Sequence, residues 1–169
     1  KQIAEWRHNT TPIPAQIRIL KDICNYIKEC CSNDGQNIYW SVENNSIGEG
    51  ALIVIRDMGE ENIPGMCVSE PIRKGHVRKF RKGFNTTHST KISACTRLKN
   101  MVENDKLIIN SKVLVSELKA FVASGSSFKA KPGENDDLVS ACLLMTRMMK
   151  VMADFDPKIF EKWTDRTSE

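Results

Sequence analysis

Apolar residues recur at two spacings along the chain, and each spacing predicts one kind of element. Between residues 15 and 31 they return every three or four positions, as on one face of an amphipathic helix. The residues of that face are Ile17, Leu20, Cys24, Ile27 and Cys31. The stretch NIYWSVE (37–43) is instead rich in aromatic and β-branched residues, which predicts a strand ending on Glu43.

The same two spacings predict the remaining elements. Helices are expected over 46–58, 89–104, 111–122 and 138–152. Strands are expected at 1–8, 66–70 and 106–110, with a hairpin at 126–133. Ser46 is expected to cap the helix that follows Glu43. Because strands alternate with helices in the first 70 residues, we expect an α/β fold with a partly parallel sheet.

Length and charge limit the classes of protein to consider. The chain has 169 residues, 40% of them hydrophobic, which is enough for the core of one globular domain. The net charge is only +4, but residues 71–102 contain nine Lys or Arg and no Asp or Glu. This basic segment is either a surface that binds nucleic-acid phosphates or a solvated face. No run of about 18 apolar residues occurs, so no membrane span is expected.

Several kinds of site are excluded by the motifs of the chain. The six cysteines form no C-x-x-C pair and no histidine stands near them at zinc-ligand spacing, so we expect reduced thiols and no structural zinc. Neither a phosphate-binding G-x-x-x-x-G-K-[ST] loop nor a G-x-G-x-x-G dinucleotide motif occurs. Nucleotide hydrolysis is therefore not expected on this chain.

Two groups of acidic residues stand where buried elements begin or end. Glu43 closes a predicted strand, and Asp136 and Asp137 open the last predicted helix in the stretch GENDDLV. Carboxylates at the carboxyl end of an α/β strand reach an edge of the sheet where ligands bind. If both groups converge, their oxygens suit Mg²⁺ or Mn²⁺, as in nucleases that use two metal ions. The alternatives are a solvated strand end for Glu43 and a helix cap for Asp136.

Three stretches carry a resemblance to a known family. They are YWSVENNSIGEGALIVIRDMG, TKISACTRLKNMVENDKLIIN and GENDDLVSACLL. In order and spacing they resemble the C-terminal nuclease domain of the large terminase subunit of tailed bacteriophages, over residues 1–153, with 154–169 as a C-terminal tail. The resemblance implies an α/β, RNase H-like fold of the retroviral integrase superfamily, in which helices flank a mixed sheet. It also implies a metal-dependent endonuclease of viral DNA packaging, which cuts concatemeric double-stranded DNA by two-metal phosphodiester hydrolysis.

The resemblance also assigns roles to residues and names partners. Glu43 is similar to the second acid of the family and Asp136 to the third, with Asp137 as a neighbouring ligand, so these three are the expected catalytic and Mg²⁺- or Mn²⁺-binding residues. The expected DNA-binding residues are Asn44, Arg73, Lys74, Arg78, Lys79, Arg81, Lys82, His88 and Lys91. The implied partners are double-stranded DNA, the terminase ATPase domain, the small terminase subunit and the portal, in the cytoplasm of a bacterial host.

One feature of the family has no counterpart here. Its first acid lies on an initial strand, whereas the acids before Glu43 are Glu5, Asp22, Glu29 and Asp34, and none has that context. We therefore expect a chain without the first strand or strands and the first catalytic aspartate, with weak or no activity of its own. An exposed sheet edge would favour a homodimer. The alternative functions are a Holliday-junction nuclease of the same superfamily and a non-catalytic module that binds DNA or docks on the motor.

Overall fold

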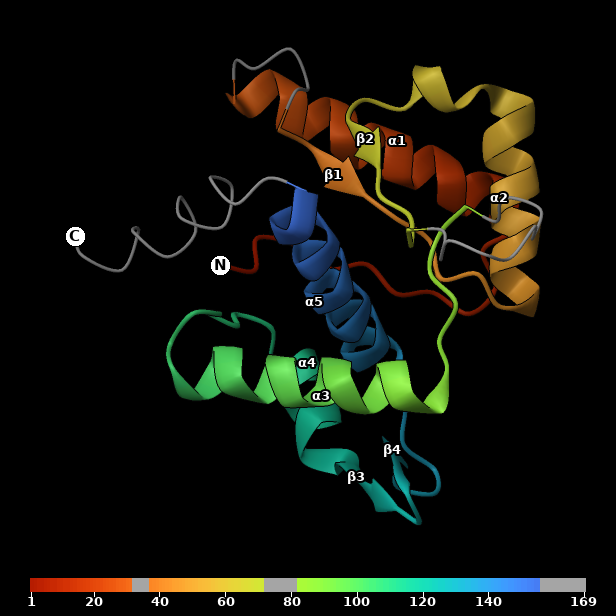
Figure 1. The fold of residues 1–169 in the computed structure, drawn as a ribbon. Helices are drawn as coiled ribbons and strands as arrows, with labels where there is room; N and C mark the ends of the chain where they lie inside the picture. The colour runs from red at the N-terminus through yellow and green to blue at the C-terminus, as the bar shows by residue number, and fades with distance from the viewer. Residues whose placement is uncertain (32–36, 72–81, 156–169) are drawn as a thin grey trace. The chain divides into compact units, whose positions relative to one another are not determined.

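The computed structural model describes residues 1–31, 37–71 and 82–155 (Figure 1). They form two compact units. We call His8–Thr86 the strand unit, and Lys1–Arg7 with the residues from Thr87 onward the helical unit. The first seven residues thus pack with the second half of the chain. The predicted tail, 154–169, lies almost wholly outside the described residues, and the predicted domain boundary stays a prediction.

The strand unit is built from two helices and a short parallel sheet. Its elements are α1 (Ile13–Cys31), β1 (Tyr39–Trp40), α2 (Ser46–Met58), the 3₁₀ turn η1 (Glu60–Asn62) and β2 (Met66–Cys67). Tyr39 pairs with Met66 and Trp40 with Cys67, so β1, α2 and β2 form a parallel crossover. The core consists of Ile17, Cys24, Ile38, Trp40, Ile55 and Ile63. The predicted apolar face of the first helix therefore packs against the strand that leads to Glu43.

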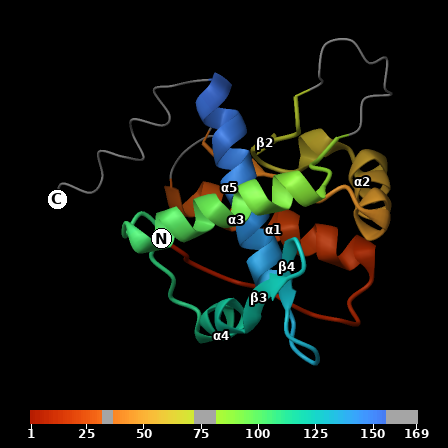
Figure 2. The ribbon, with the colours of Figure 1, turned by 60° about the horizontal axis from the view of Figure 1, so that its bottom comes forward.

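The helical unit consists of three helices and an antiparallel hairpin. Its elements are α3 (His88–Glu103), α4 (Lys112–Ala120), β3 (Phe121–Ser124), β4 (Ser127–Ala130) and α5 (Asp137–Phe155). Helix α5 crosses α3 and also contacts α4 (Figure 2). The buried residues between the helices are Ala94, Leu98, Leu114, Leu138, Val139 and Leu143. This core holds the start of α5, where the second group of predicted acids lies.

Several predicted elements are wrong in extent or in kind. The predicted helix 111–122 ends at Ala120, because Phe121 and the next three residues pair with β4 in a hairpin that begins earlier than 126. Residues 1–8 and 106–110 are not strands. The Gln2 N–H instead donates to the Ile108 carbonyl oxygen (2.8 Å), and the Asn110 amide donates to the Gln2 carbonyl oxygen (2.8 Å). These bonds tie two extended segments together without forming a regular ladder.

The fold class is α/β in the broad sense of helices combined with small sheets. The described residues form two separate two-stranded sheets, one parallel and one antiparallel. The larger mixed sheet expected for an RNase H-like fold stays a prediction. Within the described ranges, no helix is both long and apolar enough to cross a membrane.

Four of the six cysteines are at least partly buried, as expected for small apolar residues, whereas Cys30 and Cys31 are exposed. All six are free thiols, and Cys24 is fully buried in the core of the strand unit. Burial, followed by the negative charge of Glu60, raises the pKa of Cys67 to about 11. Its thiol is therefore protonated at neutral pH, and the protonated form is a poor nucleophile and a poor metal ligand.

Candidate functional site

The backbone around Glu43 is held by a segment that lies about forty residues further along the chain. Glu43 forms an isolated parallel bridge with Phe84, which is 1% exposed. The Asn44 N–H donates to the Phe84 carbonyl oxygen (2.7 Å), and the Phe84 N–H donates to the Val42 carbonyl oxygen (3.1 Å). Glu43 therefore lies on a fixed extended backbone three residues beyond the end of β1, so the predicted strand 37–43 is too long. Its half-buried side chain accepts a hydrogen bond from Asn45 Nδ2 (3.2 Å).

The glycine of the stretch VENNSIG has a steric role. A Cβ atom on Gly48 would lie 1.7 Å from the Glu43 carbonyl oxygen, far inside contact distance. The first turn of α2 can therefore pack onto the strand end only with glycine there. The N-cap of this helix is Asn45, whose side chain accepts from the Gly48 N–H (2.8 Å), so the prediction that Ser46 caps it is wrong. Ser46 is instead the first helical residue.

Asn44, expected at the DNA edge, is 8% exposed. Its Nδ2 donates to the Lys82 carbonyl oxygen (3.1 Å), and its Oδ1 is buried without a hydrogen-bond partner among the described residues. This geometry favours a role in supporting the backbone at Lys82, and DNA contact by Asn44 stays a prediction. The Lys82 ammonium group pairs with the Glu60 carboxylate. The other basic residues predicted to bind DNA in this segment lie outside the described residues: Arg73, Lys74, Arg78, Lys79 and Arg81.

Asp136 and Asp137 lie at the start of α5, but neither provides the cap of that helix. The backbone N–H groups of Leu138 and Val139 donate to Glu117 Oε2, at 2.8 and 3.2 Å. Glu117 belongs to α4 and is 5% exposed. Its other oxygen, Oε1, accepts a hydrogen bond from Arg7 Nη1 (2.7 Å). Glu117 therefore caps α5 from another helix. Capping this helix is the role that the sequence offered as the alternative for Asp136.

Glu117 and Arg7 are absent from the sequence-based predictions, although Glu117 carries a detectable signal. Within α4 the buried residues are Leu114, Glu117 and Ala120, three positions apart on one face. A charged residue on the apolar face of a helix has to be paired or hydrogen-bonded, because an isolated buried charge is costly. Its partner could not be read from the sequence, since Arg7 lies 110 residues away.

The Asp136 carboxylate faces a cation. Lys91 Nζ lies 4.0 Å from Asp136 Oδ2 and 5.4 Å from the centre of the Phe121 ring. The electrostatic attraction of the carboxylate and of the ring face places the ammonium group between α3, the hairpin and the start of α5. His88, also on α3, donates from Nε2 to the Ser126 carbonyl oxygen (2.6 Å) at the hairpin turn. The helical unit thus places Lys91 beside Asp136, with His88 three positions earlier on α3.

The chain matches a known protein family. Residues 1–148 match the family described as the terminase RNaseH-like domain, which is most of the chain. The chain belongs to this family. The match includes every predicted catalytic residue, the whole strand unit and the helical unit as far as residue 148, and it confirms the resemblance that the sequence motifs carry.

The acids of the terminase domain fit a divalent metal by their chemistry. Carboxylate oxygens are the ligands that Mg²⁺ and Mn²⁺ prefer. Glu43 belongs to the strand unit, whereas Asp136 and Asp137 belong to the helical unit. Over residues 1–31, 37–71 and 82–155, no three His, Cys, Asp or Glu side chains lie close enough together to hold a metal ion. Convergence of the three acids on one metal site therefore stays a prediction.

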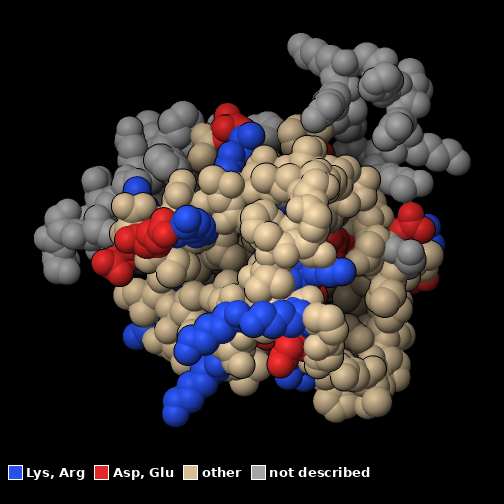
Figure 3. Space-filling model, turned by 90° about the horizontal axis from the view of Figure 1, so that it is seen from below, with Lys and Arg blue, Asp and Glu red and all other residues tan. Residues whose placement is uncertain are grey.

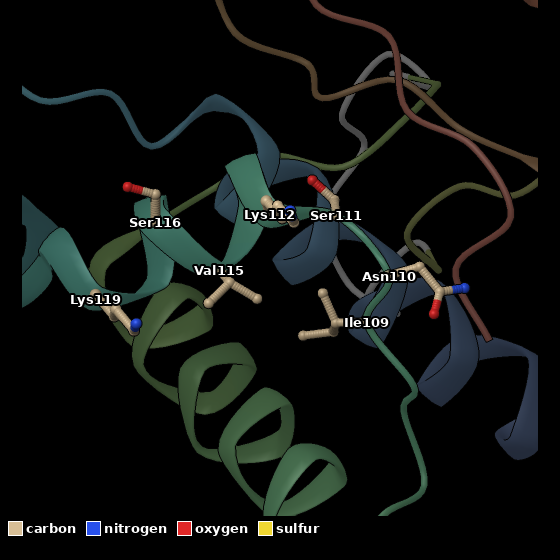
Figure 4. Close-up of a pocket in the computed structure, with 7 residues that line it drawn as sticks. All are labelled: Ile109, Asn110, Ser111, Lys112, Val115, Ser116 and Lys119. Carbon is tan, nitrogen blue, oxygen red and sulfur yellow. The ribbon is translucent and has the colours of Figure 1, made fainter.

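The helical unit of the terminase domain also has a groove beside α4. It is lined by Ile109, Asn110, Ser111, Lys112, Val115, Ser116 and Lys119 (Figure 4). None of the predicted site residues lines it. The face of the molecule drawn in Figure 3 carries mixed charge, because basic side chains lie next to acidic ones there.

Proposed function

We propose that this terminase domain is a metal-dependent endonuclease that cuts concatemeric double-stranded DNA during viral DNA packaging. The observation that carries the proposal is the setting of Asp136. Glu117 occupies the backbone donors that Asp136 would otherwise bind, and a cationic group lies beside the Asp136 carboxylate. A partly exposed carboxylate that plays no capping role keeps its oxygens available to a metal ion, which would take the place of the Lys91 ammonium group beside it.

In this proposal Glu43, Asp136 and Asp137 hold Mg²⁺ or Mn²⁺ in a two-metal site. Metal ions bound there would activate water as a nucleophile and stabilise the leaving oxygen of the phosphodiester. The task of the chain is to hold the carboxylates in place. For Glu43, the Phe84 bridge and the packing of Gly48 do this, and for Asp136 the start of α5 does it.

The basic residues supply affinity for the DNA backbone in this proposal. Neutralised phosphates release counterions, so binding is independent of sequence and weakens with salt. The described candidates in the helical unit are Lys91, which lies beside Asp136, and His88, three positions earlier on α3. Those in the strand unit are Lys82 and Asn44. The remaining proposed DNA contacts come from Arg73, Lys74, Arg78, Lys79 and Arg81.

The family relation also supports a proposal about partners and location. We propose that the domain acts beside a terminase ATPase domain, with the small terminase subunit and the portal, in the cytoplasm of a bacterial host. A homodimer that pairs through an edge of the β1–β2 sheet is part of the same proposal.

Plasmid nicking tests the catalytic proposal. Purified protein that contains this domain is incubated with supercoiled plasmid and Mn²⁺, as wild type and as Glu43→Ala and Asp136→Ala. Each substitution should lower the nicking rate at least about 100-fold, because it removes a ligand of the metal site. Glu134→Ala is the matched control, since it removes an exposed acid two residues before Asp136 that has no proposed role. If both alanine variants cut as well as the control, the acids are not catalytic.

A further inference from the structure

Helix α5 takes its N-terminal cap from another helix. In the usual arrangement the side chain of the N-cap residue accepts hydrogen bonds from the backbone N–H groups two and three positions later. Helix α5 begins at Asp137, so its N-cap position is Asp136 and those two donors are Leu138 and Val139. Both donors bind Glu117 Oε2 instead. The residue type best suited to cap this helix is present but does not cap it.

Glu117 is held firmly in this position. Its side chain is 5% exposed and has three hydrogen-bond donors around it, two from α5 and one from Arg7. A buried carboxylate is stable only when its oxygens are satisfied, so removal of any donor is costly. Arg7 comes from the N-terminal segment of the same unit. The start of α5 is therefore linked through Glu117 to residues at the beginning of the chain.

We propose that Glu117 is a positioning residue, which keeps the Asp136 carboxylate out of the helix cap and available to a divalent cation. The carboxylate is 31% exposed and already faces an ammonium group, that of Lys91 at 4.0 Å. The inference rests on the proposed function, since it gives Glu117 a role at the metal site only through Asp136. Without the Glu117 charge, the free N–H groups of α5 would attract the Asp136 carboxylate and compete with the metal.

Glu117→Gln in purified protein that contains the domain tests the inference. Glutamine keeps the shape of the side chain but replaces one acceptor oxygen by an amide that donates, and it removes the charge. The dissociation constant for Mn²⁺, measured by calorimetry, should rise about tenfold, which is the usual effect of losing a residue that orients a metal ligand. Thermal unfolding of the same samples reports the loss of stability separately.

The matched control is Ser111→Ala. Ser111 caps α4, the helix that carries Glu117, by accepting from the Leu114 N–H (2.9 Å). Its loss should lower the unfolding temperature and leave the Mn²⁺ dissociation constant unchanged. A purely stabilising role for Glu117 predicts that both variants behave alike. If Glu117→Gln does not fold, Glu117→Asp replaces it, because the shorter side chain withdraws the carboxylate from the Leu138 and Val139 N–H groups and keeps the charge that pairs with Arg7.

Asp136→Asn distinguishes a failure of the positioning role of Glu117 from a failure of the proposed metal site. If Asp136→Asn weakens Mn²⁺ binding and Glu117→Gln or its replacement leaves it unchanged, the positioning role is wrong and the proposed function stands. If Asp136→Asn binds Mn²⁺ as tightly as wild type, the proposed metal site itself is wrong. Weakened binding in both variants, with the Ser111→Ala control unchanged, supports the inference.

Discussion

Glu43 and Asp136 are both predicted metal ligands next to the start of a helix, but the chain places them by different means. The helix start beside Glu43 is shaped by residues close in sequence, since Asn45 caps α2 and Gly48 lets the helix touch the Glu43 carbonyl oxygen. The extended backbone of Glu43 itself is held by the bridge to Phe84, about forty residues later. Around Asp136 the controlling residue is Glu117, about twenty positions earlier and on another helix. The helix beside the first acid is thus capped by a neighbour in sequence, whereas the helix at the second acid is capped from another helix. Substitutions that act on one acid and spare the other test this contrast.

The largest effect is expected from Gly48→Ala. Its Cβ would press on the Glu43 carbonyl oxygen, which is backbone and cannot move aside, so we expect a loss of about 3 kcal/mol or more in the free energy of unfolding. Urea denaturation measures it. Gly50→Ala in the same helix is the control, because its Cβ would meet only the flexible end of Ile13. Equal stability of the two variants would contradict the steric role of Gly48.

A smaller loss is expected from Glu117→Ala. It leaves the Leu138 and Val139 N–H groups and the Arg7 guanidinium without their acceptor, which should cost about 2–3 kcal/mol of unfolding free energy. Urea denaturation is again the measurement. Glu103→Ala removes an exposed carboxylate that pairs with Lys99 and should change stability by less than about 0.5 kcal/mol. A loss no larger than in this control would mean that the remote cap does not stabilise α5.

The two N-cap positions should respond differently to alanine. Asn45→Ala removes a real cap and should cost about 1 kcal/mol of unfolding free energy. Asp136→Ala should cost less than about 0.5 kcal/mol, because its side chain binds no N–H group of α5 in the described structure. Asn45→Ser, which restores a capping oxygen, should recover most of the loss. Equal costs at the two positions would show that Asp136 caps its helix in solution.

The smallest expected effect concerns Cys142 on α5. Burial raises the pKa of its thiol, and the negative charge of Glu117 raises it further. Glu117→Gln should therefore lower the Cys142 pKa part of the way toward its usual value, so that alkylation begins at a lower pH. Mass spectrometry of the Cys142 peptide over a pH series measures this shift. Cys95 is the internal control, since burial raises its pKa while Lys91, not Glu117, is the charge that acts on it.

Periodicity predicts the long helices well. The observed α1, α2, α3 and α5 begin and end within a few residues of their predicted limits, because an amphipathic stripe is a local pattern. The strands are predicted less well. Residues 106–110 have strand-like composition, yet their partner is the Gln2 segment, with which they form isolated hydrogen bonds. Whether an extended segment becomes a strand depends on a distant neighbour, which composition does not specify.

The sequence by itself determined the family, the long helices and the positions of Glu43, Asp136 and Asp137 at or just before a helix start. It left open whether each acid is a cap, a solvated end or a ligand. Only the tertiary structure decided that Glu117 caps α5 and that the Asp136 carboxylate faces Lys91. The physical reason is that a helix end needs acceptors for its free N–H groups, and folding can supply them from any part of the chain.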